Sequence, residues 1–302
     1  MNIQKLATLI GSTAAAICLI SATGQQAQAG QLYQDWNYGI DAFNDGSGGA
    51  SYEIKGMAIK ETADSIFVAL TGGMPLTGVS DSVAADGNIG WGDLFFNFSG
   101  KDFQTASNEG SLFGVRFAGT NDSLVNQVGV YGNVKADSVT TTNHGYGSLK
   151  QYYNAGWEKT NTQGTDFSTA NAAYNYFYGS TVANNPTTSN TPILNVIKSG
   201  NLLGGIDLLN TTQLTQAGLD FGHFSASGSQ TVGFKFNRSL LPQKGGNFVS
   251  NLFVECGNDG VAVKGQLKAV PEPSSLAGIA AVGLMVAGSQ LRRRKQAGGD
   301  VK

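Results

Sequence analysis

Hydrophobic and polar residues alternate with a period close to two along much of residues 50–270. Leu94, Phe96 and Phe98, for example, are separated by Phe95 and Asn97. Because successive side chains of a strand point to opposite faces, this pattern predicts β-strands rather than long helices. Eight strands are expected, at residues 52–58, 66–70, 94–98, 113–117, 128–134, 232–236, 252–256 and 261–267.

Glycine is expected to build most of the turns between these strands, because the chain holds 42 Gly against 6 Pro. Short strands separated by such turns predict an all-β fold, a single antiparallel β-sandwich of jelly-roll-like type over residues 30–270. Phe96 and Val254 are expected in its core. Short helices are expected at 166–176, with Asp166 or Ser168 as the cap, and at 212–219.

The N-terminus departs from this pattern. Lys5 is followed by an apolar run over residues 6–20, and Ala27 and Ala29 match the small-x-small cleavage pattern. Residues 1–29 therefore read as a signal peptide, with the Sec translocon and signal peptidase as partners and Gly30 starting the mature chain. The alternative is an uncleaved N-terminal anchor.

One cysteine remains once the signal peptide is removed. Cys18 lies within residues 1–29, which leaves Cys256 alone and excludes an intramolecular disulfide in the mature chain. We expect Cys256 to be a buried, unreactive thiol.

The C-terminus has three parts in a fixed order. Pro271, Glu272 and Pro273 come first, and an apolar run follows at 276–291. At 1.5 Å per residue a helix over that run covers roughly 24 Å, slightly less than a bilayer core. A basic tail ends the signal, with Arg292, Arg293, Arg294 and Lys295. A membrane anchor and a buried helix are alternative readings, but a buried helix leaves the basic cluster without a role.

This order resembles the PEP-CTERM sorting signal of Gram-negative bacteria and cyanobacteria. The resemblance implies that residues 271–295 are a sorting signal with a transmembrane helix at about 274–291, inserted transiently. It also implies an exosortase as the partner that processes the chain there. The protein would pass through an inner-membrane intermediate and finish on the cell surface or in the extracellular matrix.

Three blocks in the middle of the chain carry a second resemblance: residues 91–98, 219–222 and 255–260. They are similar to blocks of a cyanobacterial family of exosortase-dependent surface proteins, for which no activity is implied. Asn258, Asp259 and Gly260 are expected to form a tight turn between two strands, with Gly260 accepting a positive φ.

Charge and candidate chemistry argue against an enzyme and against nucleic acid. The formal net charge is −2, and residues 30–270 are more acidic than the whole because the basic tail lies beyond them. His144 and His223 are the only histidines, and neither lies beside a nucleophile elbow, an HExxH pair or a CxxC pair. One enzymatic alternative remains open, in which the fold brings two carboxylates together as in a glycosidase.

Two binding sites are candidates. Asp41, Asn44 and Asp45 surround a glycine turn and supply oxygen ligands for calcium, but the loop fails the EF-hand pattern. We therefore expect no cofactor, with calcium as the weaker alternative. The aromatic-rich segment 144–178 could stack on sugar rings or cover one end of the fold. Its candidate saccharide-binding residues are Tyr152, Tyr153, Trp157 and Tyr176.

These features together predict an exported structural or interaction protein of the cell surface or extracellular matrix. The alternative is a saccharide-binding module for exopolysaccharide, and a polysaccharide-active enzyme comes third.

Overall fold

Antiparallel sheets make up most of the described protein. The computed structural model describes residues 30–41, 49–154, 167, 169–184 and 190–270. The first sheet (sheet 1) has six strands in the order β1-β2-β3-β4-β12-β11. These are β1 (Gln31–Tyr33), β2 (Trp36–Ile40), β3 (Ile54–Glu61), β4 (Ser65–Gly72), β12 (Gln230–Asn237) and β11 (Asp207–Leu209).

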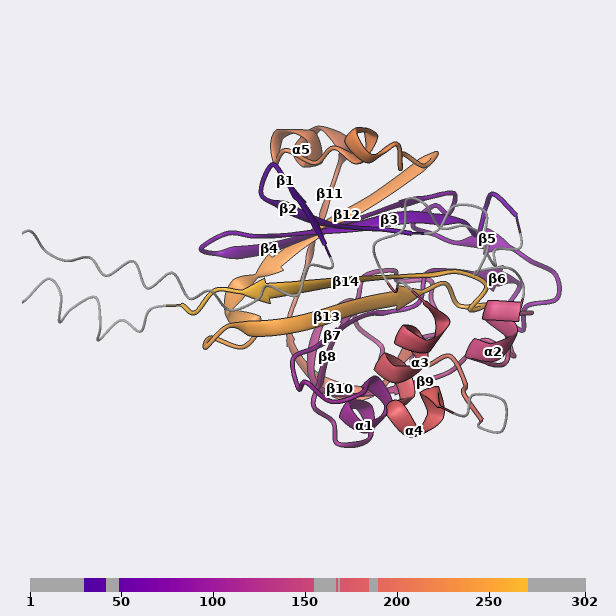
Figure 1. The fold of residues 1–302 in the computed structure, drawn as a ribbon. Helices are drawn as coiled ribbons and strands as arrows, with labels where there is room; N and C mark the ends of the chain where they lie inside the picture. Colours follow the sequence, from indigo (N-terminus) through magenta and orange to yellow (C-terminus); the bar gives the residue numbers. More distant parts are fainter. Residues whose placement is uncertain (1–29, 42–48, 155–166, 168, 185–189, 271–302) are drawn as a thin grey trace, which may run out of the picture.

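The second sheet (sheet 2) also has six strands, in the order β10-β9-β8-β7-β13-β14, and it lies below sheet 1 in Figure 1. These are β10 (Val196–Gly204), β9 (Gly129–Asp137), β8 (Leu112–Arg116), β7 (Leu94–Asn97), β13 (Gly246–Phe253) and β14 (Gly260–Leu267). A separate pair joins β5 (Val79–Ser80) to β6 (Asn88–Ile89).

Short helices cover the outer faces of both sheets (Figure 1). They are α1 (Phe103–Asn108), α2 (Leu149–Tyr152), α3 (Ala170–Tyr178), α4 (Ser180–Ala183) and α5 (Thr211–Gln216), with 3₁₀ turns η2 (Phe221–Phe224) and η3 (Arg238–Leu240). Asn210 begins α5 with a reciprocal capping box to Gln213. Within the described residues, no helix is long and apolar enough to cross a membrane.

The cap predicted for α3 was wrong. The side chain of Thr169 accepts the N–H of Ala172 and begins the helix, whereas Asp166 and Ser168 lie outside the described residues. A Thr directly before the first helical turn can satisfy an otherwise unpaired N–H of that turn, as Ser or Asp can.

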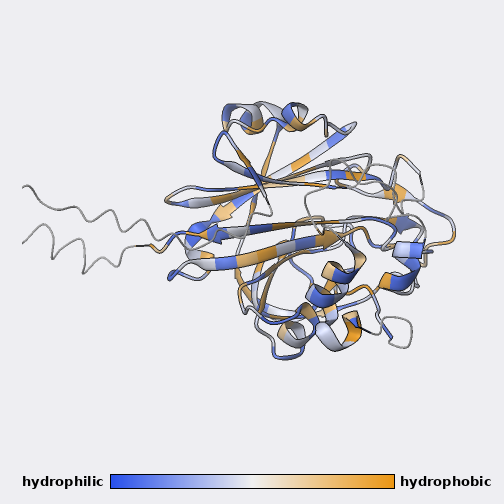
Figure 2. Ribbon diagram, in the orientation of Figure 1, coloured by the Kyte–Doolittle hydropathy of each residue, from blue (hydrophilic) through white to orange (hydrophobic). Residues whose placement is uncertain are grey.

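The largest hydrophobic cluster takes residues from both sheets. Phe96 of sheet 2 is fully buried against Phe236 of sheet 1, with ring centroids 6.3 Å apart. Phe117 and Phe234 stack at 5.1 Å in the same cluster. Val254 is also fully buried, so the burial predicted for it and for Phe96 is confirmed. β13 and β14 carry hydrophobic residues along much of their length (Figure 2).

All eight predicted strands are present, but one was placed too late. β13 covers Gly246–Phe253 rather than 252–256. The earlier part of β13 was missed because Ser250 and Asn251 are polar residues and therefore do not fit a hydrophobic pattern, although both are almost fully buried. The Ser250 hydroxyl donates to the Phe95 carbonyl oxygen at 2.9 Å, which satisfies it inside the sheet.

The turn predicted at residues 258–260 was also wrong in detail. β13 and β14 are joined by residues 254–259, and the positive φ of 61° belongs to Gly257 rather than to Gly260. Gly260 is instead the first residue of β14, opposite Phe253. The Asp259 carboxylate points inward and accepts the N–H of Ile54 at 2.6 Å.

The 254–259 connection and the last described residue lie at opposite ends of β14 (Figure 1). β14 pairs with β13 from Gly260, opposite Phe253, to Leu267, opposite Gly246. Eight residues of strand span roughly 26 Å. We call the end at residues 254–259 the distal end and the end at Val270 the exit end.

Candidate functional site

The aromatic-rich segment packs against the outer face of sheet 2. Tyr152 and Tyr153 are 2% and 9% exposed, in a cluster that includes Phe95 and Phe253 of the sheet. Tyr176 is partly buried, its hydroxyl donates to Asn251 Oδ1 at 2.8 Å, and burial raises its pKa. A ring buried in this way cannot stack on a sugar, so in this structure Tyr152 and Tyr153 cover the sheet.

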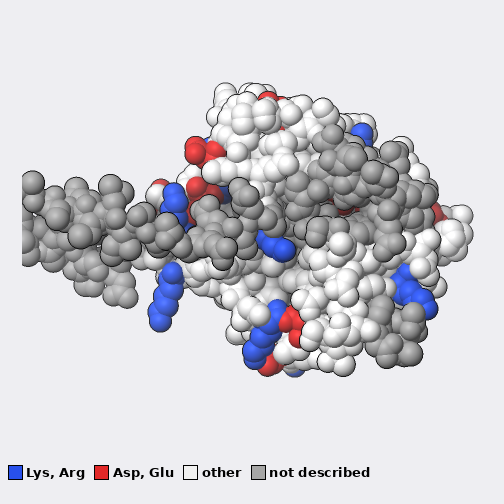
Figure 3. All heavy atoms as spheres, viewed as in Figure 1, with Lys and Arg blue, Asp and Glu red and all other residues white. Residues whose placement is uncertain are grey.

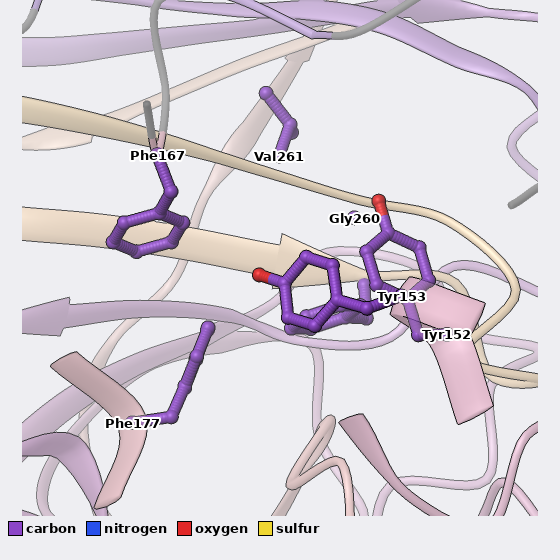
Figure 4. Close-up of a pocket in the computed structure, with 7 residues that line it drawn as sticks. Tyr152, Tyr153, Phe167, Phe177, Gly260 and Val261 are labelled. Carbon is purple, nitrogen blue, oxygen red and sulfur yellow. The ribbon is translucent and has the colours of Figure 1, made fainter. Parts of the chain in front are cut away.

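A small cavity lies within this aromatic layer (Figure 4). It leaves about 10 Å³ of free space, enough for one water molecule. Its lining is almost entirely apolar, with Tyr152, Tyr153, Phe167, Phe177, Phe253, Gly260 and Val261. The cavity is therefore too small for a sugar ring. Trp157, the fourth candidate, lies outside the described residues.

The calcium candidate is described only in part. Asp41 is fully buried and its N–H donates to the Lys55 carbonyl oxygen at 3.3 Å. Asn44 and Asp45 lie outside the described residues. Among the residues that the structure does describe, no group of three or more His, Cys, Asp or Glu side chains could hold a metal ion.

A buried polar network, which the sequence analysis did not identify, joins the residue before β7 to β10 and to the loop after β8. We call it the Asp93 relay. The Asp93 carboxylate is fully buried and accepts the N–H of Ile197 at 2.6 Å and the amide of Asn121 at 2.9 Å. Arg116 donates from Nε to Asn121 Oδ1 at 2.9 Å and from Nη2 to the Gly119 oxygen at 3.2 Å. Burial raises the pKa of Asp93, and these hydrogen bonds and the Arg116 charge oppose the rise.

Glu255 forms a second buried site, at the distal end. Its carboxylate accepts the N–H of Gly90 at 2.5 Å and also the N–H of Asp122. The side chain of Asn195 donates to the Glu255 carbonyl oxygen at 2.8 Å. Burial raises the pKa of Glu255 to about 7, and the charges of Asp122 and Asp86 act in the same direction. Both buried carboxylates join separate segments of the chain, because they accept hydrogen bonds from backbone N–H groups and, for Asp93, also from the side-chain amide of Asn121.

At this end, the block 91–98 begins beside the residues that directly precede the block 255–260. Trp91 forms a β-bridge with Val254, and the Gly92 N–H donates to the Phe253 oxygen at 2.9 Å. A Cβ on Gly92 would lie 2.4 Å from the backbone oxygens of Asn195 and Phe253, so only glycine fits there.

The third block lies on the outer face of sheet 1. Phe221 packs edge-to-face on Tyr38 of β2, with ring centroids 5.4 Å apart. The Asp220 carboxylate accepts the N–H of His223 at 3.1 Å. This block therefore fixes the η2 turn over sheet 1, away from the other two.

The two histidines occupy different surfaces. His144 Nδ1 lies 3.5 Å from Asp81 Oδ2, and the Tyr52 hydroxyl donates to the same oxygen at 3.4 Å. His223 stacks on Tyr33 with ring centroids 3.8 Å apart. These contacts orient the two imidazoles.

Cys256 should not react with a thiol reagent in the native protein. The side chain is fully buried, and burial raises its pKa to about 12, which removes the reactive thiolate at neutral pH. Labelling with a maleimide should be complete only after denaturant is added. Rapid labelling of the native protein would contradict the burial of this residue.

The two terminal signals lie outside the described residues, which begin at Gly30 and end at Val270. No family model, curated protein or solved structure matches the chain.

Proposed function

We propose that the protein is an exported structural or interaction protein of the cell surface or extracellular matrix. Its C-terminal signal would be handled by an exosortase at Pro271, Glu272 and Pro273, after transient membrane insertion of the helix at 274–291. Signal peptidase would release the chain before Gly30. The jelly-roll-like sandwich expected for residues 30–270 belongs to the same proposal.

The position of the exit end carries this proposal. Val270 follows the last residue of β14 by three positions and directly precedes Pro271. A body held through its C-terminus would therefore point its distal end away from the membrane. That end contains the Glu255 site and two of the three family-like blocks, which would face the surroundings of the cell.

The chemistry of the described residues supports a structural role over an enzymatic one. The buried carboxylates of Asp93 and Glu255 accept hydrogen bonds from backbone or amide groups of the fold itself. Catalytic carboxylates need access to a substrate. On the face drawn in Figure 3, charged side chains of both signs are scattered among uncharged ones, which gives no support for nucleic acid as a partner.

The saccharide-binding alternative now depends on Trp157 more than on the other three candidates. Tyr152 and Tyr153 are buried, and the hydroxyl of Tyr176 is bonded inside the fold. Binding of exopolysaccharide stays a hypothesis, for which the described residues offer no additional support.

The proposed sorting can be tested by changing Pro271, Glu272 and Pro273 to Ala together in the host. The uncut chain should accumulate in the membrane fraction, because the enzyme would no longer process the chain at this motif and the apolar helix and basic tail would stay attached. The matched control changes the adjacent Ser274 and Ser275 to Ala and should leave sorting intact. Normal surface delivery of the triple variant would contradict the proposal.

A further inference from the structure

The backbone of Lys268, one residue after β14, is held at both of its polar groups. Its N–H donates to the Glu61 carboxylate, at 3.0 Å from Oε2 and 3.2 Å from Oε1. Its carbonyl oxygen accepts from Nη2 of Arg238 at 2.8 Å. Two oppositely charged side chains therefore bind the backbone of this one residue by hydrogen bonds.

The two gripping side chains also bind each other. Arg238 Nε lies 2.6 Å from Glu61 Oε1, with the two side chains 2% and 16% exposed. Nη1 of Arg238 donates to the Pro242 oxygen at 3.1 Å, which fixes the guanidinium further. We call Glu61 and Arg238 the exit clamp. A bonded ion pair this well buried is costly to break on one side only.

The exit clamp joins elements of different sheets. Glu61 is the last residue of β3, and Arg238 begins η3 directly after β12, so both follow strands of sheet 1. β14, which leads into Lys268, is the edge strand of sheet 2. The clamp therefore ties the free end of that edge strand to the opposite sheet.

Two further contacts extend the grip to the end of the described chain. The Val270 N–H donates to the Gln243 oxygen at 2.9 Å. A Cβ on Gly245 would lie 2.4 Å from the Leu267 oxygen, so the chain passes directly over this glycine. Val270, which the bond to Gln243 holds, is directly adjacent in sequence to Pro271, the first residue of the sorting motif.

We propose that the exit clamp limits how readily the processing enzyme can bind the motif at residues 271–273. This inference rests on the proposed function. An extended chain covers at most about 3.5 Å per residue, so a bond within the motif lies within roughly 10 Å of the held Val270. An enzyme that draws this segment into its cleft needs the preceding residues to leave the body. Opening of residues 268–270 then precedes binding, and the clamp takes no part in the covalent step.

The clamp itself can be tested without the processing enzyme, by amide hydrogen exchange on the purified mature protein. Glu61→Gln should make the Lys268 and Val270 amides exchange roughly tenfold faster or more, because local opening becomes easier. Glu109→Gln is the matched control, since Glu109 pairs with Lys101 on the surface with both side chains about half exposed. Unchanged exchange in Glu61→Gln would overturn the clamp.

The consequence for processing is tested with the full chain in its host, by pulse-chase. Glu61→Gln and a variant with a Gly-Ser spacer inserted between Val270 and Pro271 should both be processed several-fold faster than wild type. The spacer variant leaves the clamp intact. Its processing rate therefore tests the inference even if the Glu61→Gln protein does not accumulate in the host. Equal processing rates in all chains would overturn this inference and leave the proposed function standing. Absence of C-terminal processing in every chain would overturn both.

Discussion

Replacing Arg116 by methionine should lower the free energy of unfolding by about 3–5 kcal/mol, as expected when one partner of a buried ionic network is removed. Arg116 is 8% exposed and donates to Asn121 and to backbone oxygens of the loop after β8. Without it, the buried Asp93 loses a nearby positive charge and the loop carbonyls lose their donor. Urea unfolding followed by tryptophan fluorescence measures the change.

Lys101→Met is the control for this prediction. Lys101 forms an ion pair with Glu109 at 2.6 Å, with the two side chains 49% and 46% exposed. Solvent screens such a pair, so its loss should cost no more than about 1 kcal/mol. Equal losses in the two variants would contradict the role assigned to the Asp93 relay.

The second large effect is a pH dependence that comes from Glu255. Burial raises the pKa of Glu255 to about 7 from its usual value of 4.5, so the folded protein binds this proton more tightly than the unfolded chain. The contribution to stability is full below about pH 4.5 and is lost as pH rises to about 7. The loss is on the order of 3 kcal/mol.

Glu255→Gln isolates this contribution from the other titrating groups. The variant should be less stable than wild type at low pH, because its amide NH₂ would replace one of the two carboxyl oxygens and face the N–H of Gly90 or Asp122, a donor against a donor. The difference between the two proteins should shrink as pH rises from about 4.5 to 7. Parallel stability curves for the two proteins across this range would show that Glu255 keeps an ordinary pKa.

The sequence was most informative where strands alternate cleanly. β4 and β12 were predicted from such patterns, and they pair along their full length from Ser65 to Gly72. β2 was missed because four of its five residues are buried, so it lacks alternation. β10 was missed for the opposite reason, since most of its residues are exposed on a sheet edge.

The buried polar sites were harder to predict than the strands. Asp93 and Glu255 stand inside hydrophobic blocks, which was the available sign that they are buried. The donors to these carboxylates come from distant segments: Ile197 and Asn121 for Asp93, and Gly90 and Asp122 for Glu255. No local pattern identifies which donor a buried carboxylate will meet. The aromatic segment 144–178 was visible in the sequence, but its role was not, because sugar-binding and sheet-covering aromatic residues have the same composition.

The measurement that tests the central proposal most directly is intact-mass spectrometry of the protein recovered from the surface or matrix of its own host. The mature chain should begin near Gly30 and lack the residues beyond about 271–273, because the apolar helix and the basic tail serve only for handling at the membrane. A surface protein that retains Arg292, Arg293, Arg294 and Lys295 would contradict the proposal.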